Sequence, residues 1–236
     1  MSQGEEASAL DAITRYDDRE DLRDGVARLA AQTLQNAIET RGAATLAVPG
    51  GSTPGPFLEA LSEMPLDWSR VTVMPTDERM VALDSPRLNE RLIRDSLLQG
   101  AAAAARFLGF AGPVMQANPA HILPRLCTEV EAALPLDLCV LGMGEDLHTA
   151  SLFPGADRLA LALAEDAPPV MMLHAPGVPE PRISLTRPAL CTARRCVLLL
   201  AGAGKMAALT RAAAEGPVEM APVRAILHRA EIHYAP

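Results

Sequence analysis

The sequence predicts an α/β fold with a mostly parallel sheet and helices on both of its faces. Short apolar runs, which predict strands, alternate along the chain with stretches whose apolar residues recur at helical spacing. Several of these runs end in glycine-rich or charged segments, as parallel strands do where ligands bind. Hydrophobic residues make up 49% of the 236 residues, which is enough for a sizeable core. The chain has no internal repeat and no long linker, so we expect one domain over residues 1–236.

The amino-terminal half begins with a long predicted helix. Residues 17–20 can cap it and Gly42 can end it, and its buried face is formed by Leu22, Val26, Leu29, Leu34 and Ile38. Strands are then predicted at residues 45–48 and 71–74, and helices at residues 57–64 and 89–98. The alanine-rich residues 100–105 either lengthen the second of these helices or form a loop.

The carboxyl-terminal half continues the alternation. A helix is predicted at residues 119–133, with Pro119 in its first turn. Strands are predicted at residues 136–141, 170–173, 182–186, 196–200 and 231–234, and helices from Gly202 to about residue 215 and at residues 222–228. Prolines cluster at residues 165–182 and indicate a loop-rich excursion near one edge of the sheet, not a domain boundary.

Composition excludes several classes of function. A formal net charge of −8 and an aromatic content of 3% argue against a nucleic-acid partner. No apolar run is long enough for a membrane span, and the first twelve residues lack the basic start of a signal peptide. Four cysteines without Cys-x-x-Cys spacing indicate reduced thiols, and five scattered histidines argue against zinc. We therefore expect a cytoplasmic protein without a metal.

The strand at residues 136–141 leads into the most informative stretch, residues 141–155, which carries Asp146 and His148. Histidine titrates near neutral pH and can act as a general base, and a carboxylate two residues away can orient its ring or the water. If His148 lies in the first turn of a helix, the helix dipole favours the neutral ring, whereas Asp146 acts in the opposite direction. The alternative is an Asp helix cap beside a surface histidine.

Two further segments can bind an anion. Gly50, Gly51, Ser52 and Thr53 lie between a predicted strand and a predicted helix, where backbone N–H groups and hydroxyls can hold a phosphate. Lys205 follows a strand and two glycines, but Met206 replaces the hydroxyl residue of a P-loop, which argues against nucleotide hydrolysis. An ordinary capped turn and a solvated lysine are the alternatives. Gly142 and Gly144 lack the third glycine of a dinucleotide fingerprint.

Charged residues also lie at the predicted ends of other strands. Asp77, Glu78 and Arg79 follow the strand at residues 71–74, and Arg182 begins the strand at residues 182–186. Because the carboxyl ends of parallel strands meet at one edge, Asp77 and Arg79 are candidate site residues there. Helix caps and surface salt bridges are the alternatives.

Five motifs resemble, in order along nearly the whole chain, those of the 6-phosphogluconolactonase family. Each is weak alone, but five in order are specific. They are Gly50-Gly51-Ser52-Thr53-Pro54, Thr76-Asp77-Glu78-Arg79 with Asn89, residues 141–154, Arg182-Ile183-Ser184-Leu185-Thr186, and Gly202 with Lys205.

The resemblance implies a modified Rossmann-like fold, shared with the sugar-phosphate isomerases and deaminases. It also implies hydrolysis of 6-phospho-D-glucono-1,5-lactone in the oxidative pentose phosphate pathway, with no cofactor. His148 would be the general base with Asp146 beside it, and Arg79 and Arg182 would hold the substrate together with Asp77. Lys205 and the turn at residues 50–53 would bind its phosphate.

The chemistry of a δ-lactone agrees with this implied mechanism. The lactone is an activated ester, so water can attack it without a covalent enzyme intermediate. Ser151 lies outside any Gly-x-Ser-x-Gly elbow, which argues against a serine hydrolase. Arg79 or a backbone amide near Gly144 is the candidate donor to the developing oxyanion.

The sequence departs from the family pattern at two positions, with Leu147 where the family commonly has glycine and Leu88 where it often has serine. A positive φ at Leu147 would cost about 1–2 kcal/mol. We expect ordinary backbone there, with the leucine side chain covering part of the site.

Two other functions remain as alternatives. Glucosamine-6-phosphate deaminases resemble this sequence, but they carry a glutamate shortly after the histidine, and residues 149–154 contain no carboxylate. A non-catalytic sugar-phosphate sensor on the same fold is the other alternative. The expected partner is a small sugar phosphate, and the chain is expected to be a monomer or a homodimer.

Overall fold

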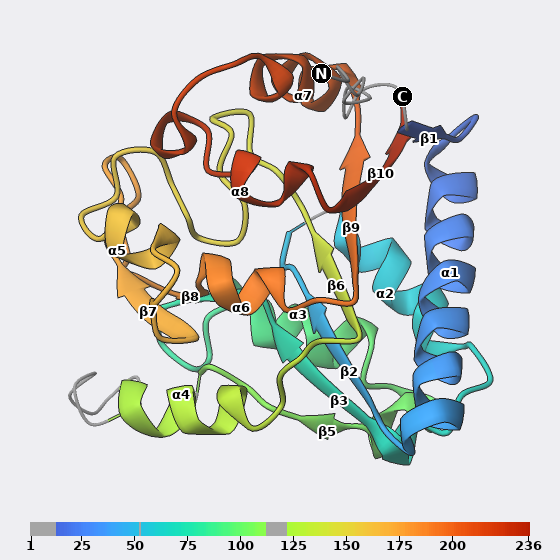
Figure 1. The fold of residues 1–236 in the computed structure, drawn as a ribbon. Helices are drawn as coiled ribbons and strands as arrows, with labels where there is room; N and C mark the ends of the chain where they lie inside the picture. Colours follow the sequence, from blue (N-terminus) through green and yellow to red (C-terminus); the bar gives the residue numbers. More distant parts are fainter. Residues whose placement is uncertain (1–12, 52, 112–121) are drawn as a thin grey trace, which may run out of the picture.

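A computed structural model describes residues 13–51, 53–111 and 122–236. Its main sheet has seven strands in the order β1-β10-β9-β6-β2-β3-β5, and every pairing within it is parallel (Figure 1). The predicted α/β class with a mostly parallel sheet is therefore confirmed. The strands are β1 (Ile13–Arg15), β2 (Ala44–Val48), β3 (Val71–Pro75), β5 (Arg106–Phe107), β6 (Leu138–Leu141), β9 (Arg195–Ala201) and β10 (Ala230–Ala235).

Helices cover both faces of this sheet and bury two separate apolar clusters against it. Alternate strand residues point to opposite faces, so Leu46 belongs to one cluster and its neighbour Ala47 to the other. The first cluster lies under α1 (Arg19–Arg41), α2 (Pro54–Ser62) and α3 (Asn89–Ser96). The second lies under α4 (Leu123–Glu131), α5 (Leu159–Leu163), α6 (Arg187–Cys191), α7 (Ala203–Ala213) and α8 (Arg224–Leu227).

The limits of α1 follow from its caps, as the sequence predicted. The Asp18 carboxylate accepts hydrogen bonds from the backbone N–H groups of Glu20 (2.8 Å) and Asp21 (2.9 Å). At the other end Gly42 adopts a left-handed φ of 81°, and its N–H donates to the carbonyl of Ile38. The helix crosses the molecule from the carboxyl edge of the sheet to its amino edge (Figure 1).

A second, antiparallel sheet joins three strands in the order β4-β8-β7. β7 (Val170–Leu173) and β8 (Arg182–Leu185) are the two strands predicted within the proline-rich excursion. The third, β4 (Asp77–Arg79), consists of three charged residues, and it pairs Asp77 with Ser184 and Arg79 with Arg182. This pairing brings two arginines that are distant in the sequence to the same place.

Other elements differ in detail from the sequence prediction. Residues 100–105, for which the sequence predicts either a longer helix or a loop, contain a 3₁₀ helix over Gly100–Ala104. α4 begins at Leu123, and the predicted start of that helix at Pro119 lies outside the described residues. α5 and α6 are additional helices of five residues each. No helix in residues 13–51, 53–111 or 122–236 has the length and apolarity that a membrane crossing requires.

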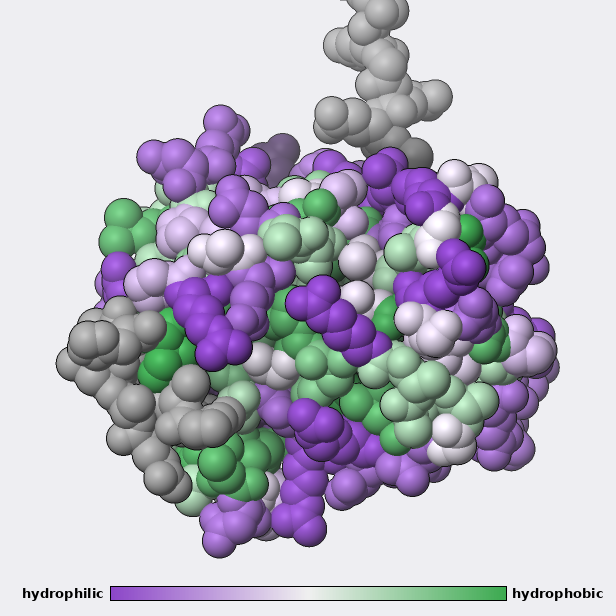
Figure 2. All heavy atoms as spheres, turned by 90° about the horizontal axis from the view of Figure 1, so that it is seen from below, coloured by the Kyte–Doolittle hydropathy of each residue, from purple (hydrophilic) through white to green (hydrophobic). Residues whose placement is uncertain are grey.

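The predicted site residues gather at the end of the main sheet where its strands have their carboxyl ends. At the carboxyl ends of β2, β3, β6 and β9 the loops carry the predicted site residues (Figure 1). The surface at the other end of the sheet, where the strands begin, is seen from below in Figure 2 and shows hydrophilic side chains interspersed with apolar ones. The carboxyl edge is therefore where the chemistry is expected.

Candidate active site

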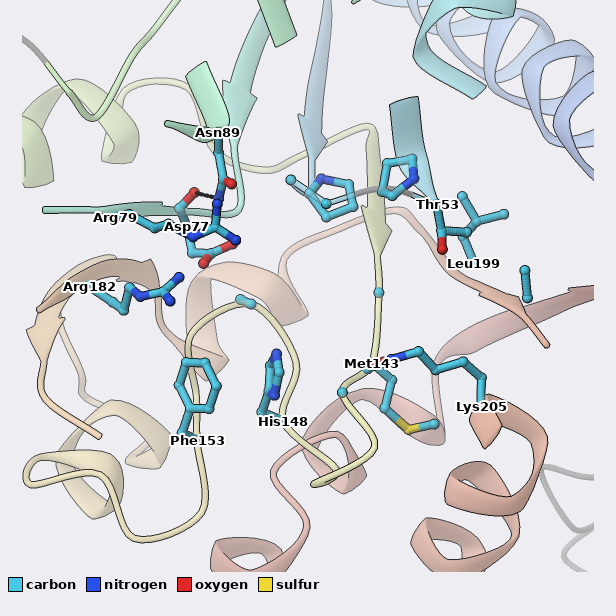
Figure 3. Close-up of a pocket in the computed structure, with 18 residues that line it drawn as sticks. Thr53, Asp77, Arg79, Asn89, Met143, His148, Phe153, Arg182, Leu199 and Lys205 are labelled. Carbon is cyan, nitrogen blue, oxygen red and sulfur yellow. Dashed lines mark hydrogen bonds between the residues drawn. The ribbon is translucent and has the colours of Figure 1, made fainter. Parts of the chain in front are cut away.

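A cleft of about 260 Å³ opens at the carboxyl edge of the main sheet. Most of the predicted site residues line it: Gly50, Gly51, Thr53, Asp77, Arg79, His148, Arg182 and Lys205. Asp146 stands behind His148 and contacts its ring. Ser52, the remaining predicted residue, lies outside the described residues. Figure 3 shows Arg79, Asp77 and Arg182 on one side of the cleft, Lys205 and Thr53 on the other, and His148 between them.

The His148–Asp146 pair lies on the loop that follows β6. Nδ1 of His148 is 2.5 Å from Oδ1 of Asp146, and the same oxygen accepts the backbone N–H of His148 at 3.3 Å. Partial burial acts to raise the pKa of Asp146, but its hydrogen bonds with His148 and the histidine charge outweigh this and lower it. An ionised carboxylate only accepts hydrogen bonds, so Nδ1 carries the proton and the lone pair of Nε2 is left for chemistry.

His148 does not lie in a helix, so the condition under which a helix dipole would favour its neutral ring is not met. Residues 145–147 form a turn and a bend, and the chain then makes an isolated bridge between Thr149 and Leu152. The helix dipole invoked for a first-turn histidine therefore does not act on this ring, and Asp146 does not cap a helix. The orientation of His148 comes from side-chain contacts instead.

The expectation of ordinary backbone at Leu147 is wrong, because its φ is +72°. This left-handed conformation costs a residue with a Cβ about 1–2 kcal/mol. Leu147 is held there by its neighbours: its N–H donates to the carbonyl of Gly144, its carbonyl accepts from Val223 N–H, and its side chain packs against the apolar core. Glycine is the residue that adopts this conformation without strain.

Gly144 is required for a different reason, which is the close approach of the Asp146 and His148 side chains. A Cβ at this position would overlap Oδ1 of Asp146 and the imidazole ring of His148. Its N–H donates to the carbonyl of His148 at 2.9 Å. The Gly144 amide itself is therefore already engaged. Arg79, the other candidate donor to the oxyanion, lines the cleft.

Arg79 and Arg182 lie side by side across the β4–β8 pairing. Arg79 donates to the carbonyl of Arg87 at 2.6 Å, and Arg182 lies 3.3 Å from the carboxylate of Glu180. The Arg182 side chain is only 11% exposed, and its Nε has no hydrogen-bond partner in the described part of the chain. Burial, opposed by the charge of Asp77, lowers the pKa of Arg182. The structure thus places Arg182 in the wall of the cleft and not on the open surface.

Asp77 is held from two directions. The Ser151 hydroxyl donates to Oδ2 of Asp77 at 2.5 Å, and Nδ2 of Asn89 donates to the Asp77 carbonyl at 2.8 Å. Ser151 lies on the loop of His148, so this bond ties that loop to β4. Neither Ser151 nor Asn89 was singled out as a site residue from its chemistry, although both fall within the motifs of the family resemblance.

Glu78 points away from the cleft and supports its wall. It is fully buried and accepts backbone N–H bonds from Arg79, Asn89 and Glu90, and the last two begin α3. Burial raises the pKa of Glu78 to about 7 against the effect of these hydrogen bonds. Glu78 therefore acts as the cap of α3 and fixes Asn89 at the cleft.

The other side of the cleft is formed by the turn after β2 and the start of α7. Gly51 has a φ of +107°, and a Cβ on Gly50 would overlap the Asn89 side chain, so both glycines are required by the turn. Nζ of Lys205 donates to the carbonyl of Met143 at 2.7 Å, which fixes the ammonium group beside the cleft. No side chain caps α7, which begins after Gly202. This side of the cleft therefore suits an anion.

Comparisons with known proteins agree with this geometry. A family model described as glucosamine-6-phosphate isomerases/6-phosphogluconolactonase matches residues 17–234. The chain belongs to this family. A 6-phosphogluconolactonase of Rhizobium meliloti is 45% identical over 226 residues, with 92% of this chain and 94% of the relative covered. One of Pseudomonas aeruginosa is 42% identical, with 90% of each covered.

Solved structures of the family share the fold. The crystal structure of a 6-phosphogluconolactonase from Shewanella baltica superimposes with a TM-score of 0.90 at 32% identity, covering 95% of this chain and 97% of that one. A monomeric glucosamine-6-phosphate deaminase has a TM-score of 0.75 at 17% identity over 94% of this chain and 95% of that one, which shows the common fold alone. The resemblance inferred from the five motifs is thus confirmed. In the described residues no group of three or more His, Cys, Asp or Glu side chains is placed to hold a metal ion.

Proposed function

We propose that the chain hydrolyses 6-phospho-D-glucono-1,5-lactone to 6-phosphogluconate, a step of the oxidative pentose phosphate pathway. The 6-phosphogluconolactonases at 45% and 42% identity support this proposal. The observation that carries it is the His148–Asp146 pair, joined at 2.5 Å, at a cleft that also contains Arg79, Arg182 and Lys205. Such a cleft offers one base and several cations to a phosphorylated ester. A cytoplasmic location and a monomeric or homodimeric state stay predictions.

His148 acts as the general base in this mechanism. Its Nε2 takes a proton from water as the oxygen attacks the lactone carbonyl, while Asp146 stabilises the imidazolium that forms. The carbonyl electrons move to the oxygen, where Arg79 stabilises the negative charge. The electrons then return, the bond from the carbonyl carbon to the ring oxygen breaks, and His148 gives its proton to that oxygen. No bond forms between enzyme and substrate, and a positioned base of this kind contributes about 10²–10⁴-fold.

The two sides of the cleft orient the substrate (Figure 3). Lys205 and the turn at Gly50, Gly51 and Thr53 hold the phosphate, because an ammonium group, backbone N–H groups and the start of α7 all favour an anion there. Arg182 and Asp77 hold the sugar hydroxyls at the opposite wall, next to His148. The lactone carbonyl then lies between the base and Arg79.

Ring-opening deamination suits the cleft less well. The deaminase reaction needs a second carboxylate beside the histidine, and residues 149–154 contain none. Within the described residues, Asp77 is the one carboxylate in the cleft wall, and the Ser151 hydroxyl already binds it. Ammonia release from glucosamine 6-phosphate without lactone turnover would overturn our proposal in favour of this reaction.

The test is lactone hydrolysis by the His148→Ala variant, with spontaneous ring opening subtracted. We expect kcat to fall by about 10²–10⁴-fold, with little change in affinity for 6-phosphogluconate. His174→Ala is a matched control, because His174 also pairs with an aspartate, Asp157 at 3.2 Å, but lies outside the cleft. Wild-type rates for His148→Ala would remove it as the base. Binding of 6-phosphogluconate by a wild-type protein without turnover would indicate a sensor.

A further inference from the structure

Phe153 contacts the face of the His148 ring. The two ring centroids are 4.1 Å apart and the ring planes are inclined by 33° (Figure 3). Phe153 is 9% exposed, whereas the side chain of Asp146, the other partner of the imidazole, is 52% exposed. The edge of the imidazole is therefore held by Asp146, which can move into solvent. One face of the imidazole is held by Phe153, which is buried and cannot.

The chain between the two rings explains why Phe153 is fixed. Ala150 adopts a φ of +48°, and the N–H of Leu152 donates to the carbonyl of Thr149 at 3.0 Å, so the chain turns back. Residue 151 is anchored through its hydroxyl on Asp77 and its N–H on the Ser184 hydroxyl, and Leu152 is fully buried. These anchors bring residue 153 beside residue 148.

Arg182 approaches the Phe153 ring as well. Its guanidinium carbon lies 5.7 Å from the ring centroid, within the range of a cation–π contact. Figure 3 shows the ring close to both Arg182 and His148. Phe153 thus contacts a substrate-binding cation and the base, and it separates the guanidinium from the imidazolium that forms during the reaction.

We propose that Phe153 is a positioning residue of the reaction proposed above, on which this inference rests. Its ring fixes the rotation of the imidazole about its side-chain bonds, so that Nε2 is directed at the attacking water. Asp146 alone fixes Nδ1 but lets the ring swing about that contact. Misplacement of a catalytic group by about 1 Å is enough to lower a rate by about 10²-fold.

The experiment compares Phe153→Leu with Phe110→Leu. Phe110 is a buried phenylalanine of the same apolar cluster outside the cleft, so it controls for the lost ring in the core. We expect Phe153→Leu to lower kcat by about 10-fold or more with KM within about twofold, since the loss acts on a catalytic group. The control should keep wild-type kcat, and both variants should lose similar thermal stability.

A double-mutant cycle separates positioning from a general structural effect. In a His148→Ala background, Phe153→Leu should have no further effect on kcat, because the proposed effect of the ring on kcat is exerted through His148. Equal effects in both backgrounds, or a rise in KM at unchanged kcat, would overturn the proposal. If the wild-type protein hydrolyses the lactone and Phe153→Leu has the same kcat, the role of Phe153 alone is overturned. If the wild-type protein does not hydrolyse the lactone, the proposed function is overturned and the role of Phe153 with it.

Discussion

Replacing Gly144 with alanine should separate the side chains of Asp146 and His148 and leave the fold intact. The added Cβ would overlap Oδ1 of Asp146 and the imidazole of His148. Both are the far ends of side chains that are partly exposed, so they can move outward and relieve the clash. The backbone of Gly144 lies outside the left-handed region, so alanine adds no backbone strain. The clash therefore acts mainly on the position of the base.

The size of the effect follows from the value of a positioned base. A fully effective base contributes about 10²–10⁴-fold, and Gly144→Ala displaces His148 without removing it, so we expect the lower end. A 10²-fold loss of kcat corresponds to about 2.7 kcal/mol of transition-state stabilisation. The free energy of unfolding should change by about 1 kcal/mol or less, or about 2–4 °C in Tm for a chain of this length.

Lactone hydrolysis, corrected for spontaneous opening, measures the first quantity and thermal unfolding measures the second. Gly55→Ala is the matched control, since Gly55 lies in α2 and a Cβ there makes ordinary contact with Leu92 of α3 at 3.7 Å and does not meet His148. Wild-type kcat for Gly144→Ala would show that the Asp146–His148 contact does not position the base, and would refute the reasoning. A large fall in Tm would show that the clash is relieved by the backbone instead.

Three further predictions follow from the cleft and its support. Lys205→Ala and Arg182→Ala should each weaken 6-phosphogluconate binding by about 10–100-fold, as loss of a hydrogen bond to a charged group does, and calorimetry measures this. Lys205→Arg should not restore affinity, because a planar guanidinium cannot replace a compact ammonium that also donates to Met143. The pKa of Glu78 is raised to about 7, so its contribution to stability is present below its unfolded pKa and is lost as the pH rises through 7, by up to about 3 kcal/mol. Unfolding at pH 5 and pH 8 should show this loss in the wild type and less of it in Glu78→Gln; an identical pH dependence would contradict the assignment.

The elements that the sequence predicted are those whose signals are local. Asp18 and Gly42 bound α1 because capping involves only neighbouring backbone groups. The strand that leads to His148 was predicted because strands of a parallel sheet are buried on both faces and stand out as apolar runs. In the same way, the sequence predicted that the glycine turn at Gly50 and the lysine after Gly202 lie at the carboxyl ends of the parallel strands, where both line the cleft.

The features that the sequence missed depend on contacts between distant segments. β4 has three charged residues and no apolar pattern, and it exists because β8, about a hundred residues later, pairs with it. The left-handed backbone of Leu147 is likewise fixed from outside, by Val223 in the segment before α8. In the sequence, nothing distinguishes Phe153 from a core phenylalanine. Its contact with His148 depends on the turn at Ala150, which only the structure shows.

The identity of the cation at position 205 is itself informative. The chain contains 21 basic residues, and Lys205 is the one lysine among them, so every other cation is a guanidinium. The planar guanidinium suits flat partners, such as the Phe153 ring that Arg182 approaches, whereas an ammonium group donates in several directions from one point. At Lys205 one of those directions is occupied by the Met143 carbonyl, on the loop that also carries His148. In the mechanism proposed above, a single ammonium therefore holds both the loop of His148 and the phosphate, which would couple substrate binding to the position of the base.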